Sequence, residues 1–167
     1  MKNQYKIFKS TDSDSNYNFV FEQFGGKDTN SYRDVVKKHK KQGQSQLLLN
    51  SKLMIEMIGW TLSQSNTEKI ILKNFNLDND QEDVNDEEFS DLLSQSNGDY
   101  DIAISKLMKL LDWCVDSGSI DIKSIMVSSF NQDKMADIFF NGTFSGDVEI
   151  FESFINPFLM DQYQNVN

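Results

Sequence analysis

The sequence predicts an α+β protein, with a small mixed or antiparallel sheet packed against two or three apolar helices in a single domain. A length of 167 residues suits one domain with a sizeable core. Short alternating or β-branched runs predict strands, whereas longer segments with apolar residues at helical spacing predict helices. We therefore treat residues 1–167 as one domain, with an acidic loop or short helix inserted at about 74–101.

The first half of the chain opens with two predicted strands. Tyr5 to Lys9 forms one, and Tyr17 to Phe24, in which alternate residues differ in polarity, forms the other. Ser31 to Lys41 has a helical composition with few apolar anchors, which predicts a surface helix. Gln46 to Ser63 is apolar around its whole circumference and predicts the central buried helix.

The middle of the chain holds a strand and the best-defined helix. Lys69 to Lys73 is a β-branched run that predicts a strand. Asp99 or Asp101 can cap the helix that follows the acidic stretch. A wide apolar stripe from Ala103 to Val115 predicts the buried face of this helix, and Gly118 predicts its end.

Two strands and a helix complete the predicted fold. Ile120 to Val127 and Met135 to Phe140 predict the strands. The turn at Asn141-Gly142 is expected to be of type I′, because both residue types tolerate positive φ. The last helix begins near Val148, and Pro157 is expected to kink or end it.

An acidic block is the dominant feature of the composition. Ten carboxylates and no Lys, Arg or His lie between Lys73 and Lys106. Like charges repel, so this block stays solvated unless a cation or a basic partner neutralises it. It therefore predicts an interaction surface or a solvated loop. The residues that we expect to contact a partner are Asp78, Asp80, Glu82, Asp83, Asp86, Glu87, Glu88 and Asp91.

Charge is divided unevenly between the two parts of the chain. Residues 1–52 hold ten Lys/Arg against five Asp/Glu, whereas residues 53–167 hold six against twenty-one. The basic run from Arg33 to Lys41 suits either contact with phosphate or pairing with the acidic block of the same chain. A single arginine in the chain disfavours direct nucleic-acid binding, which relies on bidentate arginine contacts.

The sequence indicates a cytoplasmic protein. Cys114 is the single cysteine and falls in an apolar helical pattern, which predicts a buried thiol in a reducing compartment. The most apolar window, Leu47 to Leu62, is interrupted by Asn50, Lys52 and Glu56, so we expect no membrane span.

No metal or cofactor motif is present in the sequence. A calcium loop that starts at Asp78 needs glycine at its sixth position and glutamate at its twelfth, but it finds Asp83 and Phe89. There is no His/Cys zinc set and no Gly-rich phosphate loop. We therefore assign no metal site and no cofactor, and leave open loose divalent-cation binding by the acidic block.

Catalysis by histidine is also not expected. His39 is the single histidine, so a Ser-His-Asp or Cys-His hydrolase would have to use it. It lies between Lys38 and Lys40 on a weakly anchored helix, which predicts an exposed side chain. We assign no catalytic residue.

Two segments resemble families that cleave phosphodiesters. Asp121-Ile122-Lys123 resembles the PD-(D/E)xK nucleases over these three residues, which implies a metal held by the acid and a water oriented by the lysine. That family has a further acid on or near a preceding strand, whereas Asp112 and Asp116 here fall on a predicted helix.

The second resemblance is to phospholipase-D-like domains, over roughly Leu107 to Phe154. It rests on a helix that ends in glycine, two strands, and the step Gly142-Thr143. Gln132-Asp133-Lys134 stands where that family has His-x-Lys, so the resemblance implies a copy without the histidine nucleophile.

These exclusions favour a non-enzymatic acidic module that binds a basic protein surface, such as a groove that normally holds nucleic acid. A phage-encoded inhibitor of a host defence nuclease, or a toxin-immunity protein, suits this size and charge. The alternatives are a small metal-dependent phosphodiesterase or nuclease, and a structural subunit of a larger assembly.

Overall fold

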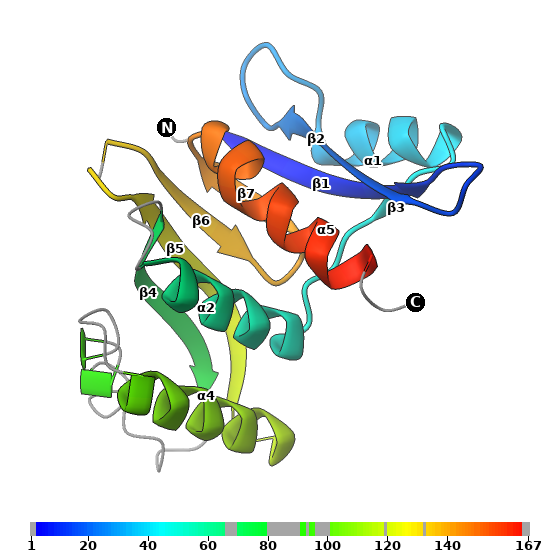
Figure 1. Ribbon diagram of the computed structural model, residues 1–167. Coiled ribbons are helices and arrows are strands. Elements are labelled where there is room, and N and C mark those ends of the chain that lie inside the picture. Colours follow the sequence, from blue (N-terminus) through cyan, green and yellow to red (C-terminus); the bar gives the residue numbers. More distant parts are fainter. Residues whose placement is uncertain are drawn as a thin grey trace.

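An antiparallel sheet with seven strands forms the framework of the computed structural model (Figure 1). The structure describes residues 3–65, 70–79, 91–92, 94–95, 101–118, 120–131 and 133–164. In chain order the elements are β1 (Gln4–Thr11), β2 (Tyr17–Phe24), α1 (Tyr32–Lys41), β3 (Ser45–Gln46), α2 (Ser51–Ser65), β4 (Ile70–Asn79), α4 (Asp101–Asp116), β5 (Ile120–Ser129), β6 (Met135–Phe139), β7 (Thr143–Gly146), η1 (Phe151–Ile155) and α5 (Asn156–Gln164). The predicted fold class, an α+β domain with an antiparallel sheet against apolar helices, is confirmed.

The sheet joins distant parts of the chain. Its strand order is β2-β1-β7-β6-β5-β4, and β3 pairs with β1. β7 pairs with the first half of β1, from Gln4 to Lys6, while β3 pairs with Phe8 and Lys9. The same edge of β1 is therefore shared by β7 and β3.

The main core lies between the sheet and the helices α2, α4, η1 and α5, which cover one face of it (Figure 1). Tyr5 of β1 stacks on Phe144 of β7 with ring centroids 4.8 Å apart. Trp60 of α2 meets Phe158 of α5 edge to face at 6.1 Å. The helical positions expected in the core are fully buried at Leu107, Leu111 and Phe154, and partly buried at Trp60 and Leu110.

The central helix starts later than predicted, at Ser51 rather than Gln46. The backbone N–H groups of Leu47 and Leu49 donate to Ile7 and Phe140, so this segment completes the sheet instead of a helix. The side chain of Asn50 then accepts from Leu53 N at 2.9 Å and caps α2.

Strand β4 is longer than predicted and runs past Lys73 to Asn79. Register shifts between Leu72 and Asn74, and again between Asn76 and Leu77, allow the strand to follow β5 over its full length. The first carboxylate of the acidic block, Asp78, therefore belongs to the sheet.

The β6–β7 hairpin has a different turn from the one predicted. Among the described residues Gly142 has a φ of 71°, but Asn141 does not have a positive φ, which rules out type I′. Gly142 N donates to Phe139 O at 2.9 Å, as in a turn followed by a left-handed glycine. The Asn141 side chain accepts from Thr143 N at 3.1 Å, an Asx-type bond within the turn.

Pro157 does not end the last helix. The helix passes through a π-helical turn, η1, in which Asn156 N–H bonds to Phe151 O, and continues as α5 to Gln164. Pro157 has no backbone N–H to donate. It lies at the start of α5, where the hydrogen-bonding pattern changes from π-helix to α-helix.

Candidate functional site

The acidic block begins at the edge of the sheet. Asp78 lies on β4, the last strand at this end, and Asp91 is exposed in a short helical piece. Asp101, which closes the block, is the exposed first residue of α4. The other expected partner-binding residues, Asp80, Glu82, Asp83, Asp86, Glu87 and Glu88, lie outside the described residues.

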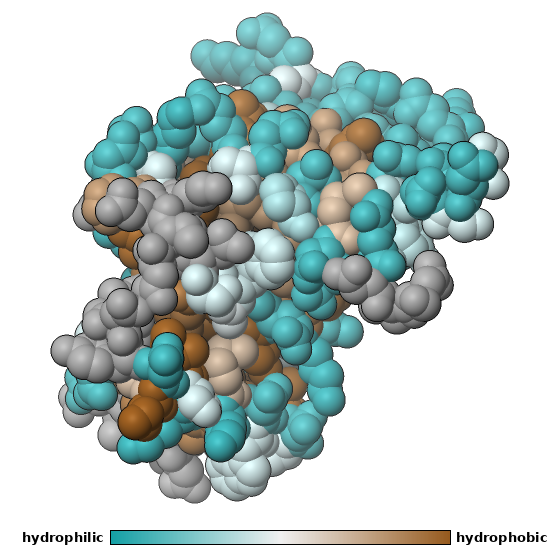
Figure 2. All heavy atoms as spheres, in the orientation of Figure 1, coloured by the Kyte–Doolittle hydropathy of each residue, from teal (hydrophilic) through white to brown (hydrophobic). Residues whose placement is uncertain are grey.

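The basic run lies at the opposite end of the sheet. Helix α1, which carries Arg33 and four lysines, contacts β2 and β3, and β2 is the other edge strand (Figure 1). Adjacent strands lie about 4.8 Å apart, so the five steps from β2 to β4 separate the two ends by roughly 24 Å. Lys38 pairs with Glu22 on the neighbouring β2. The surface over this end is mostly hydrophilic (Figure 2).

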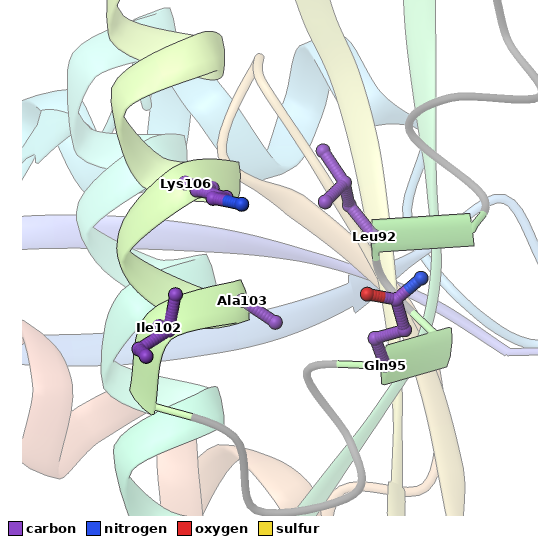
Figure 3. A pocket seen from close by; sticks show the side chains of 5 residues that line it. All are labelled: Leu92, Gln95, Ile102, Ala103 and Lys106. Carbon is purple, nitrogen blue, oxygen red and sulfur yellow. The ribbon is translucent and has the colours of Figure 1, made fainter.

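A pocket of about 380 Å³ lies beside the described acidic residues. Ile102, Ala103 and Lys106 line it from α4, while Leu92 and Gln95 face them from the short helical pieces (Figure 3). Hydrophobic surface shows between hydrophilic atoms in the lower part of Figure 2. Sequence reasoning did not anticipate this pocket, because α4 was assessed for its buried stripe and not for its outer face.

Asp121 and Lys123 line a second pocket, of about 270 Å³. Both side chains are exposed on β5, so the expectation that they share a face is confirmed. Ser51 Oγ, at the start of α2, donates to Asp121 Oδ1 at 2.9 Å and accepts from Ile122 N at 3.3 Å. The pocket is lined by Leu49, Asn50, Ser51, Asp121, Ile122, Lys123 and Phe140.

The register of β4 and β5 pairs the backbone of another acidic residue with Asp121. Asp78 lies directly opposite Asp121, and the register shift falls at Lys123. The sequence analysis considered Asp112 and Asp116 as the further acid. Both are exposed on α4, and Asp116 pairs with Lys52 at 2.9 Å. It missed Asp78 because β4 was predicted to stop at Lys73. Within the described ranges no group of three or more His, Cys, Asp or Glu side chains could hold a metal.

His39 is buried, which contradicts the expected exposed side chain. Its ring stacks on Phe8 with centroids 3.7 Å apart, and 6% of the residue is accessible. Nε2 lies 2.9 Å from Glu22 Oε2, and Nδ1 contacts Gln44 Oε1. The sequence analysis failed here because Phe8 points to the face of β1 away from the main core, where α1 covers it. The contacts explain His39 as a structural anchor for α1.

Lys6 is a buried cation that the sequence analysis missed. Its side chain is fully inaccessible, and its ammonium donates to the carbonyl oxygen of Leu47 at 2.7 Å and to that of Asn141. Burial lowers the pKa of Lys6 from 10.5 to about 8. The alternation of β1 was a usable signal, because Tyr5 and Ile7 enter the main core and Lys6 must point the other way.

Three further findings concern Cys114, the helices and the similarity of this chain to known proteins. Cys114 is buried, as expected. In the part of the chain that the structure describes, every helix is too short or too polar to cross a membrane. Comparison with protein families, with curated proteins and with solved structures finds no match to this chain.

Proposed function

We propose that this protein is a non-enzymatic binding module whose acidic end docks on a basic protein surface. One observation carries the proposal: Asp78, the first residue of the acidic block, lies on the edge strand β4, while the basic helix α1 lies at the opposite edge. A partner that approaches β4 therefore meets the end of the sheet where the acidic block begins, far from the basic run of α1, with Lys73 as the cation on that strand. Opposite charge on the partner accelerates encounter and selects the orientation of the complex.

The spacing of the carboxylates suggests the kind of partner. Ten of them lie between Lys73 and Lys106, and an array of this density can imitate nucleic-acid phosphates. The proposed partner has a groove that normally holds nucleic acid, as in a nuclease or a toxin. An inhibitor of a defence nuclease and an immunity protein both fit this description.

The test uses a partner captured from the source cell and compares association kinetics for three proteins. Changing Asp83, Asp86, Glu87 and Glu88 to Asn or Gln should slow association more than it speeds dissociation. A control with the same change in charge alters the exposed Asp14, Asp28, Glu56 and Glu152. Rising salt should weaken wild-type binding, because exposed charges are screened over about 8 Å at physiological ionic strength.

Competition identifies the groove. An oligonucleotide should displace the protein if both occupy the same basic surface. Equal association rates for the quadruple variant and the wild type would reject the docking function.

A second candidate function is supported by the register of β4 and β5. Asp78 and Asp121 occupy directly opposite positions, and Lys123 is exposed one position beyond Ile122. Two carboxylates can hold Mg²⁺ or Mn²⁺, and a lysine can orient the attacking water, so we propose metal-dependent phosphodiester cleavage as the alternative.

The alternative predicts cleavage of DNA or RNA that requires Mg²⁺ or Mn²⁺. Asp121→Asn and Lys123→Met should each abolish it, while Lys27→Met, at an exposed position on the far side of the sheet, should not. Absence of cleavage by the wild-type protein across both metals and both nucleic acids would reject this candidate.

A further inference from the structure

The outer face of α4 carries an exposed stripe that lies outside the main core. Its members are Ile102, Lys106, Lys109 and Trp113, which fall within roughly 60° of one another at 3.6 residues per turn. Ile102 is 74% exposed and Trp113 is 66% exposed, while both lysines are exposed between them. The stripe is about 16 Å long at 1.5 Å per residue.

The lysines of this stripe, Lys106 and Lys109, pair with no carboxylate in the part of the chain that the structure describes. By contrast, Asp116 on the flank of the same helix pairs with Lys52. The stripe therefore places two cations between two large apolar side chains, on a helix that also exposes Asp101, Asp112 and Asp116 and in a chain of net charge −10.

The pocket beside α4 extends the stripe sideways. Ile102 and Lys106 belong to both, and Leu92 closes the far side (Figure 3). An apolar side chain that lies over Ile102 can therefore enter a cavity of about 380 Å³ instead of meeting a flat surface. Apolar anchors that enter pockets dominate the binding energy of helical ligands.

We propose that this stripe is a docking surface for an acidic amphipathic helix of a partner protein. The carboxylates of that helix lie over Lys106 and Lys109, and its apolar side chains cover Ile102 and Trp113. The net negative charge of the chain repels such a ligand at long range, so the apolar ends supply the affinity and the two lysines set the register. This inference does not depend on the acidic end being a binding site.

A second copy of the chain fits the stripe poorly. Two α4 helices packed antiparallel through it would place Ile102 against Trp113, but Lys106 against Lys109. Like charges placed opposite one another destabilise a contact. Charge complementarity therefore favours an acidic occupant over a symmetric dimer.

The probe is a synthetic helical peptide that repeats the spacing of the stripe, with leucine at the two apolar positions and glutamate at the two lysine positions. Trp113 reports binding by fluorescence in a Trp60→Phe background, because the chain has two tryptophans. A saturable change in Trp113 emission with the glutamate peptide is expected. A peptide of the same composition in scrambled order should give none.

Charge exchange tests the register. Lys106→Glu with Lys109→Glu should weaken binding of the glutamate peptide at least tenfold and should strengthen binding of a lysine version of the peptide. Lys37→Glu with Lys41→Glu on α1 changes the net charge equally and should do neither. Trp113→Ala, measured by calorimetry, should also weaken binding at least tenfold, with unchanged circular dichroism.

Three results would overturn the proposal. The first is equal effects of the α1 and α4 charge reversals, which would mean that bulk charge and not the stripe controls binding. The second is dimerisation of the protein without peptide, detected by sedimentation, together with a change in Trp113 emission that rises with the fraction of dimer. The third is a rise in peptide affinity on neutralising Asp83, Asp86, Glu87 and Glu88 that exceeds the rise on neutralising Asp14, Asp28, Glu56 and Glu152, which would identify the chain's own acidic segment as the occupant.

Discussion

The ammonium of Lys6 lies 2.7 Å from the carbonyl oxygen of Leu47, although the two residues are 41 positions apart. This bond closes the place on β1 where β7 stops and β3 begins. Ile7 continues the junction through its backbone, since its N–H donates to Gly142 and its carbonyl accepts from Leu47. A charged side chain thus supplies the hydrogen bonds that strand pairing leaves unmade.

Lys6 should make the stability depend on alkaline pH. Burial lowers its pKa to about 8 in the folded chain, against 10.5 as its usual value. Between these values the unfolded chain binds more protons, so the contribution of Lys6 to the free energy of unfolding rises as the pH rises from about 8 to 10.5. Lys6→Met removes this increment.

Urea unfolding of both proteins at several pH values across this window measures the effect. The difference in free energy between wild type and Lys6→Met should shift in favour of the wild type as the pH rises. A difference that stays constant would mean that the ammonium is not desolvated.

Gly142→Ala should be strongly destabilising. A Cβ at this position would lie 2.1 Å from the carbonyl oxygen of Leu47, and φ is +71°. Gly25 has a φ of +76° with nothing within 4 Å, so Gly25→Ala incurs only the left-handed backbone cost of about 1–2 kcal/mol. Denaturant unfolding should show at least twice this loss for Gly142→Ala. Equal losses in the free energy of unfolding for the two variants would show that the backbone at Leu47 shifts at little cost to accommodate the added Cβ.

Glu22 should contribute to stability above mildly acidic pH. Burial raises the pKa of Glu22, but hydrogen bonds from Lys38 and His39 outweigh this effect and hold it below 4.5. The stabilisation is therefore present above about pH 4.5 and is lost as the pH falls through the lowered pKa. Glu22→Gln should be less stable than the wild type at pH 6, and the gap should close on acidification. Glu56→Gln, at an exposed position, is the control.

Leu111→Ala should cost about 2–5 kcal/mol, because it removes a fully buried side chain and leaves a cavity. Ser105→Ala on the exposed side of the same helix should change the free energy of unfolding by less than about 0.5 kcal/mol. Thermal or urea unfolding of the two variants decides whether α4 belongs to the core. An unchanged midpoint for Leu111→Ala would contradict its position there.

The sequence predicted the fold class and most elements because apolar periodicity reports burial directly. The β2 strand has its predicted ends, Tyr17–Phe24, and the buried stripe of α4 contains Leu107 and Leu111 as expected. Errors arose where long-range pairing overrode local pattern. Leu47 and Leu49 were predicted to be helical, but their N–H groups donate to the carbonyl oxygens of Ile7 on β1 and of Phe140.

The candidate sites were predictable only in part. The chemistry of Asp121 and Lys123 was visible in the sequence, whereas the opposite position of Asp78 depends on the register of two strands separated by α4. His39 was predicted to be exposed because its neighbours along the chain are lysines. Its stacking partner Phe8 belongs to β1, which is distant in the sequence. Contacts of this kind leave no local signal.

The place of Lys6 also has a consequence for the order in which the chain is made. β1 and β2 can form their hairpin early, but residues 143–146 of β7 emerge from the ribosome only after most of the chain has been synthesised. Until then one edge of β1 is open, and open edges recruit strands from other molecules. Lysine on an open edge disfavours pairing with other strands, so we expect Lys6 to hinder premature pairing of β1 before its ammonium binds Leu47 and Asn141 in the finished sheet.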